Sequence, residues 1–141
     1  MGIKQIELIP IQDPSPLIPS GKGHYVKAFQ AVRTNTTSVV KAVLPAQSSV
    51  WNVYFYGSVD SDAATTATLT VTVSDNSGVI STGTVDVKGA GATNALVNMT
   101  NLPNIEQVPT NGDLKVACVY AETGGASTVG GPWKVGIEYV V

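Results

Sequence analysis

Hydrophobic and polar residues alternate along most of this chain of 141 residues, and helical spacing of apolar positions is almost absent. Alternation with a period of two is typical of a half-buried β-strand. The clearest case is TTATLTVTV at residues 65–73, where Ala, Leu and Val occupy one face and threonine the other. The pattern predicts strands at residues 4–9, 24–33, 39–45, 49–57, 65–73, 79–89 (one or two short strands), 94–102, 114–121 and 133–141.

Clusters of Asp, Asn, Ser, Gly and Pro separate these segments, for example SDNSG at 74–78 and Asn-Gly at 111–112. Such residues form tight turns. Short strands separated by turns predict an all-β sandwich or barrel. We therefore predict one domain over residues 1–141, an antiparallel β-sandwich of about eight strands. Two long turn-rich connections favour jelly-roll or Greek-key wiring, with an immunoglobulin-like sandwich as the alternative.

The predicted strand SVWNVYFYG at 49–57 is rich in aromatic residues. Strict alternation places Trp51, Val53 and Phe55 in the core. It leaves Tyr54 and Tyr56 at a surface or an interface.

The first and last of the long strand segments differ in pattern. Residues 24–33 have apolar side chains on both faces, which indicates a strand that packs on both sides. The last segment, WKVGIEYVV, places one set of apolar residues on a single, core-facing side. These are Trp133, Val135, Ile137, Tyr139 and Val141.

The threonine row of residues 65–73 predicts that Thr68 and Thr70 point out of the core. Threonine favours strands and suits a solvated face. Its low charge also suits packing against another subunit. Ice binding would need the row on several adjacent strands, and the next segment adds only Thr82 and Thr84.

Composition excludes several kinds of partner. Charged residues make up 13% of the chain, about half the usual share, and the net charge is −2. The eight cations form no cluster, so we expect no nucleic-acid binding. No apolar stretch approaches the length of a membrane span, and no signal-peptide pattern opens the chain, so we expect a cytoplasmic protein without a membrane partner.

The residue types that catalyse reactions or bind metals are scarce. Cys118 lies in the apolar run LKVACVYA and is predicted to be a buried thiol, and His24 is predicted at a surface or edge. One cysteine and one histidine provide neither a catalytic triad nor a zinc site. We expect no enzyme activity and no cofactor.

Acidic residues near two turns resemble calcium loops in part. Asp60, Asp62 and Asp75 fit plain turn chemistry as well. An EF-hand counted from Asp60 would need a glutamate at its twelfth position, where this chain has Val71. Calcium held between two adjacent turns stays an alternative.

Four of the eight prolines lie between Pro10 and Pro19, in PIQDPSPLIPSGKG. Proline favours extended conformations and removes ladder donors, so residues 10–23 are predicted to form an arm or long loop. The segment is either a connector within the domain or an arm that reaches a neighbouring subunit. Its candidate contact residues are Pro14, Pro16, Leu17, Ile18 and Pro19.

The Pro-rich arm, the aromatic strand VWNVYFYG, the closing strand WKVGIEYVV and the charge-poor all-β composition together resemble a known family. The chain is similar to the cement, or decoration, proteins on the capsids of tailed double-stranded DNA phages, of the jelly-roll type known from Bordetella phage. The resemblance implies a jelly-roll fold, homodimers or other homo-oligomers on the shell, and contacts to the major capsid protein. It also implies location on the virion capsid after assembly in the host cytoplasm.

Under this hypothesis the contact candidates are the arm, Tyr54, Tyr56, the threonines Thr68 and Thr70, and the Gly-rich loop at 122–132. The main alternative is a carbohydrate- or receptor-binding β-sandwich of a phage tail fibre or adhesin. Its aromatic residues would stack on sugars, although alternation turns both tryptophans inward. Another virion part, such as a tail or head–tail connector subunit, is a further alternative.

Overall fold

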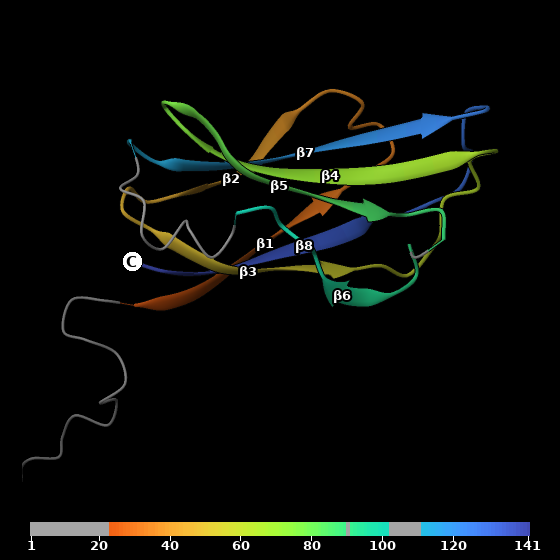
Figure 1. Cartoon of the computed structure of the whole chain (residues 1–141). Helices are drawn as coiled ribbons and strands as arrows, with labels where there is room; N and C mark the ends of the chain where they lie inside the picture. The colour runs from red at the N-terminus through yellow and green to blue at the C-terminus, as the bar shows by residue number, and fades with distance from the viewer. Residues whose placement is uncertain (1–22, 90, 102–110) are drawn as a thin grey trace, which may run out of the picture.

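The computed structural model describes residues 23–89, 91–101 and 111–141, and these form eight strands without a helix (Figure 1). The predicted strand at 4–9 lies outside the described residues, as does the predicted arm except Gly23. The strands are β1 (His24–Ala31), β2 (Val39–Leu44), β3 (Ser49–Tyr56), β4 (Thr66–Asp75), β5 (Gly78–Asp86), β6 (Asn94–Leu96), β7 (Leu114–Thr123) and β8 (Trp133–Val140).

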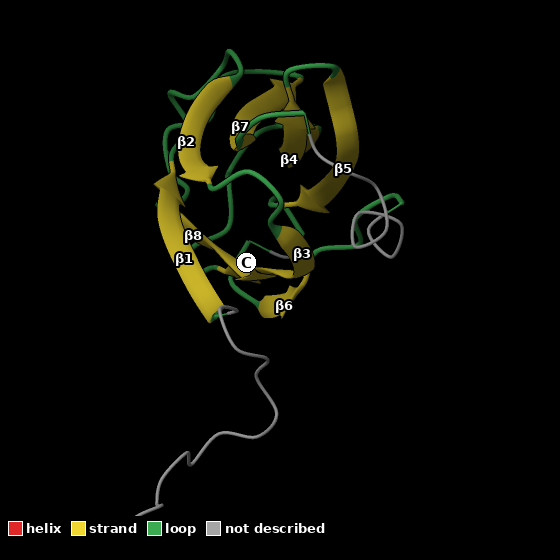
Figure 2. Cartoon of the chain, turned by 90° about the vertical axis from the view of Figure 1, so that its left-hand side faces the viewer, coloured by secondary structure: helices red, strands yellow, loops and turns green. Residues whose placement is uncertain are grey.

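The strands form two four-stranded antiparallel sheets that face each other, in the orders β1-β8-β3-β6 and β2-β7-β4-β5 (Figures 1 and 2). The strands of the first half of the chain pair with those of the second half in reverse order, as β1–β8, β2–β7, β3–β6 and β4–β5. One long hairpin folded at β4–β5 and rolled into two sheets is the wiring of a jelly roll. The predicted all-β sandwich is confirmed, and its strand order distinguishes it from an immunoglobulin-like sandwich.

β4 is a central strand that pairs with β7 on one side and β5 on the other. Its inward residues Ala67, Leu69, Val71 and Val73 are all fully buried. The threonines of the same strand are turned away from this core, and Thr68 and Thr70 remain partly exposed. The predicted register of this strand is therefore confirmed.

The core between the sheets is built mainly from β3, β4, β7 and β8. In β8, Trp133, Val135 and Ile137 are fully buried, and Tyr139 is nearly so, as the alternation predicts. Trp133 packs against Tyr120 of β7, with ring centroids 5.6 Å apart. Cys118 lies in this core, which confirms the predicted buried thiol, and burial raises its pKa.

Two predicted strands differ from the observed ones. β1 does not pack on both sides, because in a two-layer sandwich only the inner face of each sheet meets the other sheet. In this edge strand Ala31 alone is fully buried and Phe29 partly so. His24 at its start is exposed, as predicted. β6 ends at Leu96, shorter than predicted, because its pairing with β3 stops after the register pair Tyr54–Leu96.

Candidate functional site

The predicted contact residues lie on opposite sides of the sandwich. Tyr54 and Tyr56 occupy the outer face of the β1-β8-β3-β6 sheet, whereas Thr68 and Thr70 occupy the outer face of the other sheet. The structure therefore does not bring them into one site. The candidates in the predicted arm, Pro14, Pro16, Leu17, Ile18 and Pro19, lie outside the described residues.

The outer face of the β1-β8-β3-β6 sheet exposes large apolar side chains from three strands. Val26 is 65% exposed, Leu96 60%, Trp51 50% and Tyr56 43%. Monomeric proteins rarely expose contiguous apolar surface without using it as an interface. We call this surface the aromatic face. Its residues are His24, Val26, Ala28, Trp51, Asn52, Tyr54, Tyr56, Leu96, Gly136 and Glu138.

The position of Trp51 corrects the prediction that places it in the core. The pairing of β3 with β8 shifts register between Val50 and Asn52, so a β-bulge interrupts the alternation at Trp51. Val50 takes the buried position instead, while Val53 and Phe55 remain buried as predicted. A bulge adds one residue and turns the side chain next to it to the other face. Of the two tryptophans that alternation turns inward, only Trp133 points into the core.

A single carboxylate organises the middle of the aromatic face. Glu138 accepts hydrogen bonds from Asn52 Nδ2 at 3.1 Å and Tyr54 Oη at 3.0 Å, and His24 Nε2 lies 3.6 Å from its Oε1. Desolvation alone would raise the pKa of Glu138, but the hydrogen bonds from Asn52 and Tyr54 and the nearby His24 outweigh it and lower that pKa. The carboxylate is thus held ionised among exposed apolar and aromatic side chains.

The aromatic rings of this face are fixed against one another. Tyr54 and Tyr56 stack with ring centroids 6.2 Å apart, and the His24 and Trp51 rings lie 6.1 Å apart. Gly136 of β8 lies beneath the tyrosines, where a Cβ atom would already be in contact with Tyr56 at 3.5 Å. Aromatic pairs held in this way present a rigid surface that loses little entropy on binding.

Sequence reasoning missed Val26, Leu96 and Glu138 as parts of this face. Their shared position depends on the register that sets Val26 opposite Glu138 and Leu96 opposite Tyr54. Strand pairing between distant segments is not visible in a single sequence. The one related signal is the presence of apolar residues on both faces of residues 24–33, which include Val26.

The outer face of the β2-β7-β4-β5 sheet carries a row of threonine hydroxyl groups. Thr70 and Thr84 share a hydroxyl hydrogen bond of 3.0 Å, and Thr66 and Thr123 share one of 2.7 Å. Neighbouring strands thus extend the row beyond β4. We call this surface the threonine face. Its residues are Thr66, Thr68, Thr70, Thr72, Thr82, Thr84 and Thr123.

The Gly-rich loop at 122–132 is tied to two other segments. Arg33 donates to the carbonyl oxygens of Ser127 at 2.6 Å and Thr128 at 2.9 Å. Asp62 accepts hydrogen bonds from Val129 N, Thr128 Oγ1 and Thr128 N, and together these lower its pKa to about 2.

The acidic residues considered for calcium serve turns and loops. Both carboxylate oxygens of Asp62 bind Thr128, and those of Asp75 accept from Ser77 N and Asn111 N. In the described ranges, no three His, Cys, Asp or Glu side chains are grouped so that they hold a metal ion. Those ranges also contain no helix long and apolar enough to cross a membrane.

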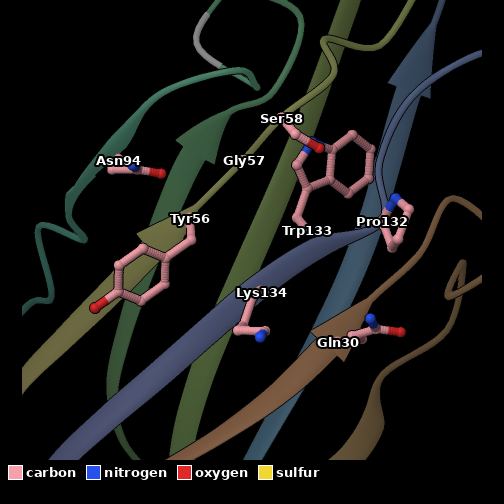
Figure 3. Close-up of a pocket in the computed structure, with 8 residues that line it drawn as sticks. All are labelled: Gln30, Tyr56, Gly57, Ser58, Asn94, Pro132, Trp133 and Lys134. Carbon is pink, nitrogen blue, oxygen red and sulfur yellow. The ribbon is translucent and has the colours of Figure 1, made fainter.

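A shallow hollow of about 580 Å³ opens at one end of the aromatic face (Figure 3). Its lining combines one exposed aromatic ring with amide, hydroxyl and ammonium groups. The lining residues are Gln30, Tyr56, Gly57, Ser58, Asn94, Pro132, Trp133 and Lys134.

No protein-family model matches the sequence, and no curated protein matches it. Among solved structures, the chain is similar to one chain of the cyanophage Pam1 capsid asymmetric unit, with 15% sequence identity and a TM-score of 0.43. The alignment covers 99% of this chain and 97% of the other. At this identity and TM-score the likeness assigns no function to the chain.

Proposed function

We propose that the protein is a structural virion protein that binds the outside of a phage capsid and stabilises the shell by bridging major capsid protein subunits. The observation that carries the proposal is the aromatic face, where Val26, Trp51 and Leu96 are exposed together on one side of a rigid sheet. An apolar surface of this kind is typical of a protein interface.

The jelly-roll wiring supports the same proposal, since it is the fold that the sequence resemblance implies. Jelly rolls are common in viral capsid and lectin domains, so the wiring alone does not choose between them. A stabilising role needs no chemical step. Each copy adds buried surface across the joints between capsid subunits, and a standard interface buries roughly 1,600 Å² in total. Many copies on one shell make the gain cumulative.

The proposal includes self-association on the shell as a homodimer or other homo-oligomer. β1 pairs with β8 on one side, and no strand among the described residues pairs with its other edge. Exposed strand edges are ready sites for pairing with another chain. Sedimentation velocity of the purified protein at several concentrations measures this directly, and a monomer at every concentration contradicts it.

The test of capsid binding is co-sedimentation with purified, expanded shells that lack this protein. The proposal expects saturable binding and a higher melting temperature of the decorated shell. A double variant, Trp51→Ser with Leu96→Ser, is expected to lose binding while remaining folded. The matched control is Val79→Ser, which removes a side chain that is 67% exposed on the other sheet.

The outcomes separate the function from the face that performs it. Failure of the wild-type protein to bind expanded shells contradicts the proposed function. Binding that survives the double variant but is lost in Val79→Ser or in a Thr68→Ala, Thr70→Ala variant assigns docking to the outer face of the other sheet, which includes the threonine face, instead.

A further inference from the structure

Four of the residues that line the hollow at the end of the aromatic face form a row of register partners across all four strands of the sheet. Gln30 of β1 lies opposite Lys134 of β8, Lys134 lies opposite Tyr56 of β3, and Tyr56 lies opposite Asn94 of β6 (Figure 3). At about 4.8 Å between neighbouring strands, the row is about 14 Å long. That length suits an oligosaccharide better than a single small molecule.

The chemistry of the row suits sugar hydroxyl groups. Carboxamides both donate and accept hydrogen bonds, as sugar hydroxyls do. The side chains of Gln30 and Asn94 take part in none of the hydrogen bonds found within the described residues, and the exposed Ser58 adds a hydroxyl to the rim. Tyr56 stacks on Tyr54 and is still 43% exposed, so part of its ring is accessible to the apolar face of a sugar.

Trp133, which lines the hollow from the core side, is held in place and has its polar group bonded. Trp133 is fully buried, and its indole N–H donates to the carbonyl oxygen of Val59 at 3.0 Å. The hollow is open and shallow, unlike the deep apolar pockets that enclose small ligands. It therefore fits a chain that lies along the surface.

The charge of the hollow is one-sided. Lys134 stands between Gln30 and Tyr56 in the row. No Asp or Glu is among the residues that line the hollow, and Lys134 forms no ion pair within the described residues. Glu138, the nearest carboxylate of the same strand, is four residues along and is already bonded to Asn52 and Tyr54. An unpaired ammonium group between a carboxamide and an aromatic ring attracts an anionic group on the ligand.

We propose that this hollow binds an acidic oligosaccharide, with Tyr56 as the stacking platform, Gln30 and Asn94 as hydroxyl partners and Lys134 as partner of a sugar carboxylate. This activity goes beyond the proposed capsid role. It is measured on the isolated protein, so its failure leaves the capsid proposal untouched, and the converse also holds.

The experiment is a titration of the isotope-labelled full chain with oligogalacturonate, followed by NMR at physiological ionic strength. Neutral maltohexaose and poly-glutamate are the comparison ligands. The proposal expects saturable shifts centred on residues 30, 56, 94 and 134, weaker binding of maltohexaose at the same place, and no localised binding of poly-glutamate. Lys134→Gln should weaken oligogalacturonate binding about tenfold, since it removes one charged hydrogen bond.

Two variants keep the result interpretable. Tyr56→Ala, at a half-exposed position, should abolish binding of both sugars, whereas Thr70→Ala on the threonine face should leave it unchanged. Absence of shifts at millimolar oligogalacturonate overturns the proposal. Shifts centred elsewhere, equal binding of poly-glutamate, or unchanged affinity in both Lys134→Gln and Tyr56→Ala overturn it as well.

Discussion

Tyr54 Oη donates a hydrogen bond of 3.0 Å to Glu138 Oε2, across the pair of strands that forms the middle of the aromatic face. This contact places the carboxylate of Glu138 against an aromatic ring rather than in open solvent. It raises the pKa of the Tyr54 phenol, chiefly because the hydrogen bond to Glu138 favours the protonated phenol, with burial and the carboxylate charge adding to the effect.

The first prediction concerns the Glu138→Gln variant. Because the carboxylate holds the proton on Tyr54, its replacement by a neutral amide should let Tyr54 ionise at a lower pH than in the wild type. An ultraviolet absorbance titration of tyrosinate measures this shift. Tyr54→Phe is the control, since it should remove the late-titrating component from the wild-type curve. Identical curves for the wild type and Glu138→Gln contradict the assignment.

The second prediction separates the two tryptophans. Trp51 is half exposed and Trp133 is fully buried. Iodide, a quencher that stays in water, should therefore quench the emission of Trp51 and spare that of Trp133. The Trp51→Phe variant should show blue-shifted emission that iodide hardly affects, and Trp133→Phe should show the opposite. Equal quenching in both variants contradicts the bulge at Trp51.

The alternation of the chain was enough to predict the sandwich because the core depends on periodic strands such as β4 and β8. Leu69, Val71 and Ile137 lie where a period of two places them. The aromatic face and the hollow at its end could not be predicted from alternation in the same way. A bulge changes the face of Trp51 without leaving a turn residue in the sequence, and the row that joins Gln30 to Asn94 exists only through strand order.

From the sequence alone, the tyrosines and the threonines can be assigned to different strands, but not to opposite sides of the molecule. Tyr56 and Thr70 are both outward residues. They lie on different sheets because the chain passes from one sheet to the other between β3 and β4. The composition shows only that the chain as a whole is poor in charged residues. It contains no information on which face is apolar enough to dock.

The third prediction tests the register of β4. Leu69→Ala removes a fully buried side chain and should destabilise the protein by about 2–5 kcal/mol. Thr70→Ala removes a partly exposed hydroxyl next door and should cost less than about 1 kcal/mol. Urea unfolding followed by circular dichroism compares the two. Similar losses in both variants would mean that the strand does not distinguish a core side from an outer side.

The last prediction uses pH to test how the loop at 122–132 is held. The pKa of Asp62 falls from its ordinary value of 3.8 to about 2, chiefly because Val129 N and Thr128 Oγ1 donate to the ionised carboxylate. A depressed folded-state pKa stabilises the fold above the unfolded-state pKa. Asp62 therefore contributes its full stabilisation above pH 3.8, and that contribution is lost as the pH falls toward 2.

Asp62→Asn should accordingly be less stable than the wild type at neutral pH, and the two should converge as the pH approaches 2. Thr128→Val removes one side-chain donor but keeps the backbone N–H, so its acid limb should fall between the two. Thermal melting at a series of pH values gives all three curves. Protonation of Asp62 in the wild type should remove its advantage over Asp62→Asn. A constant difference in stability between the two at every pH would therefore show that the carboxylate charge does not hold the loop.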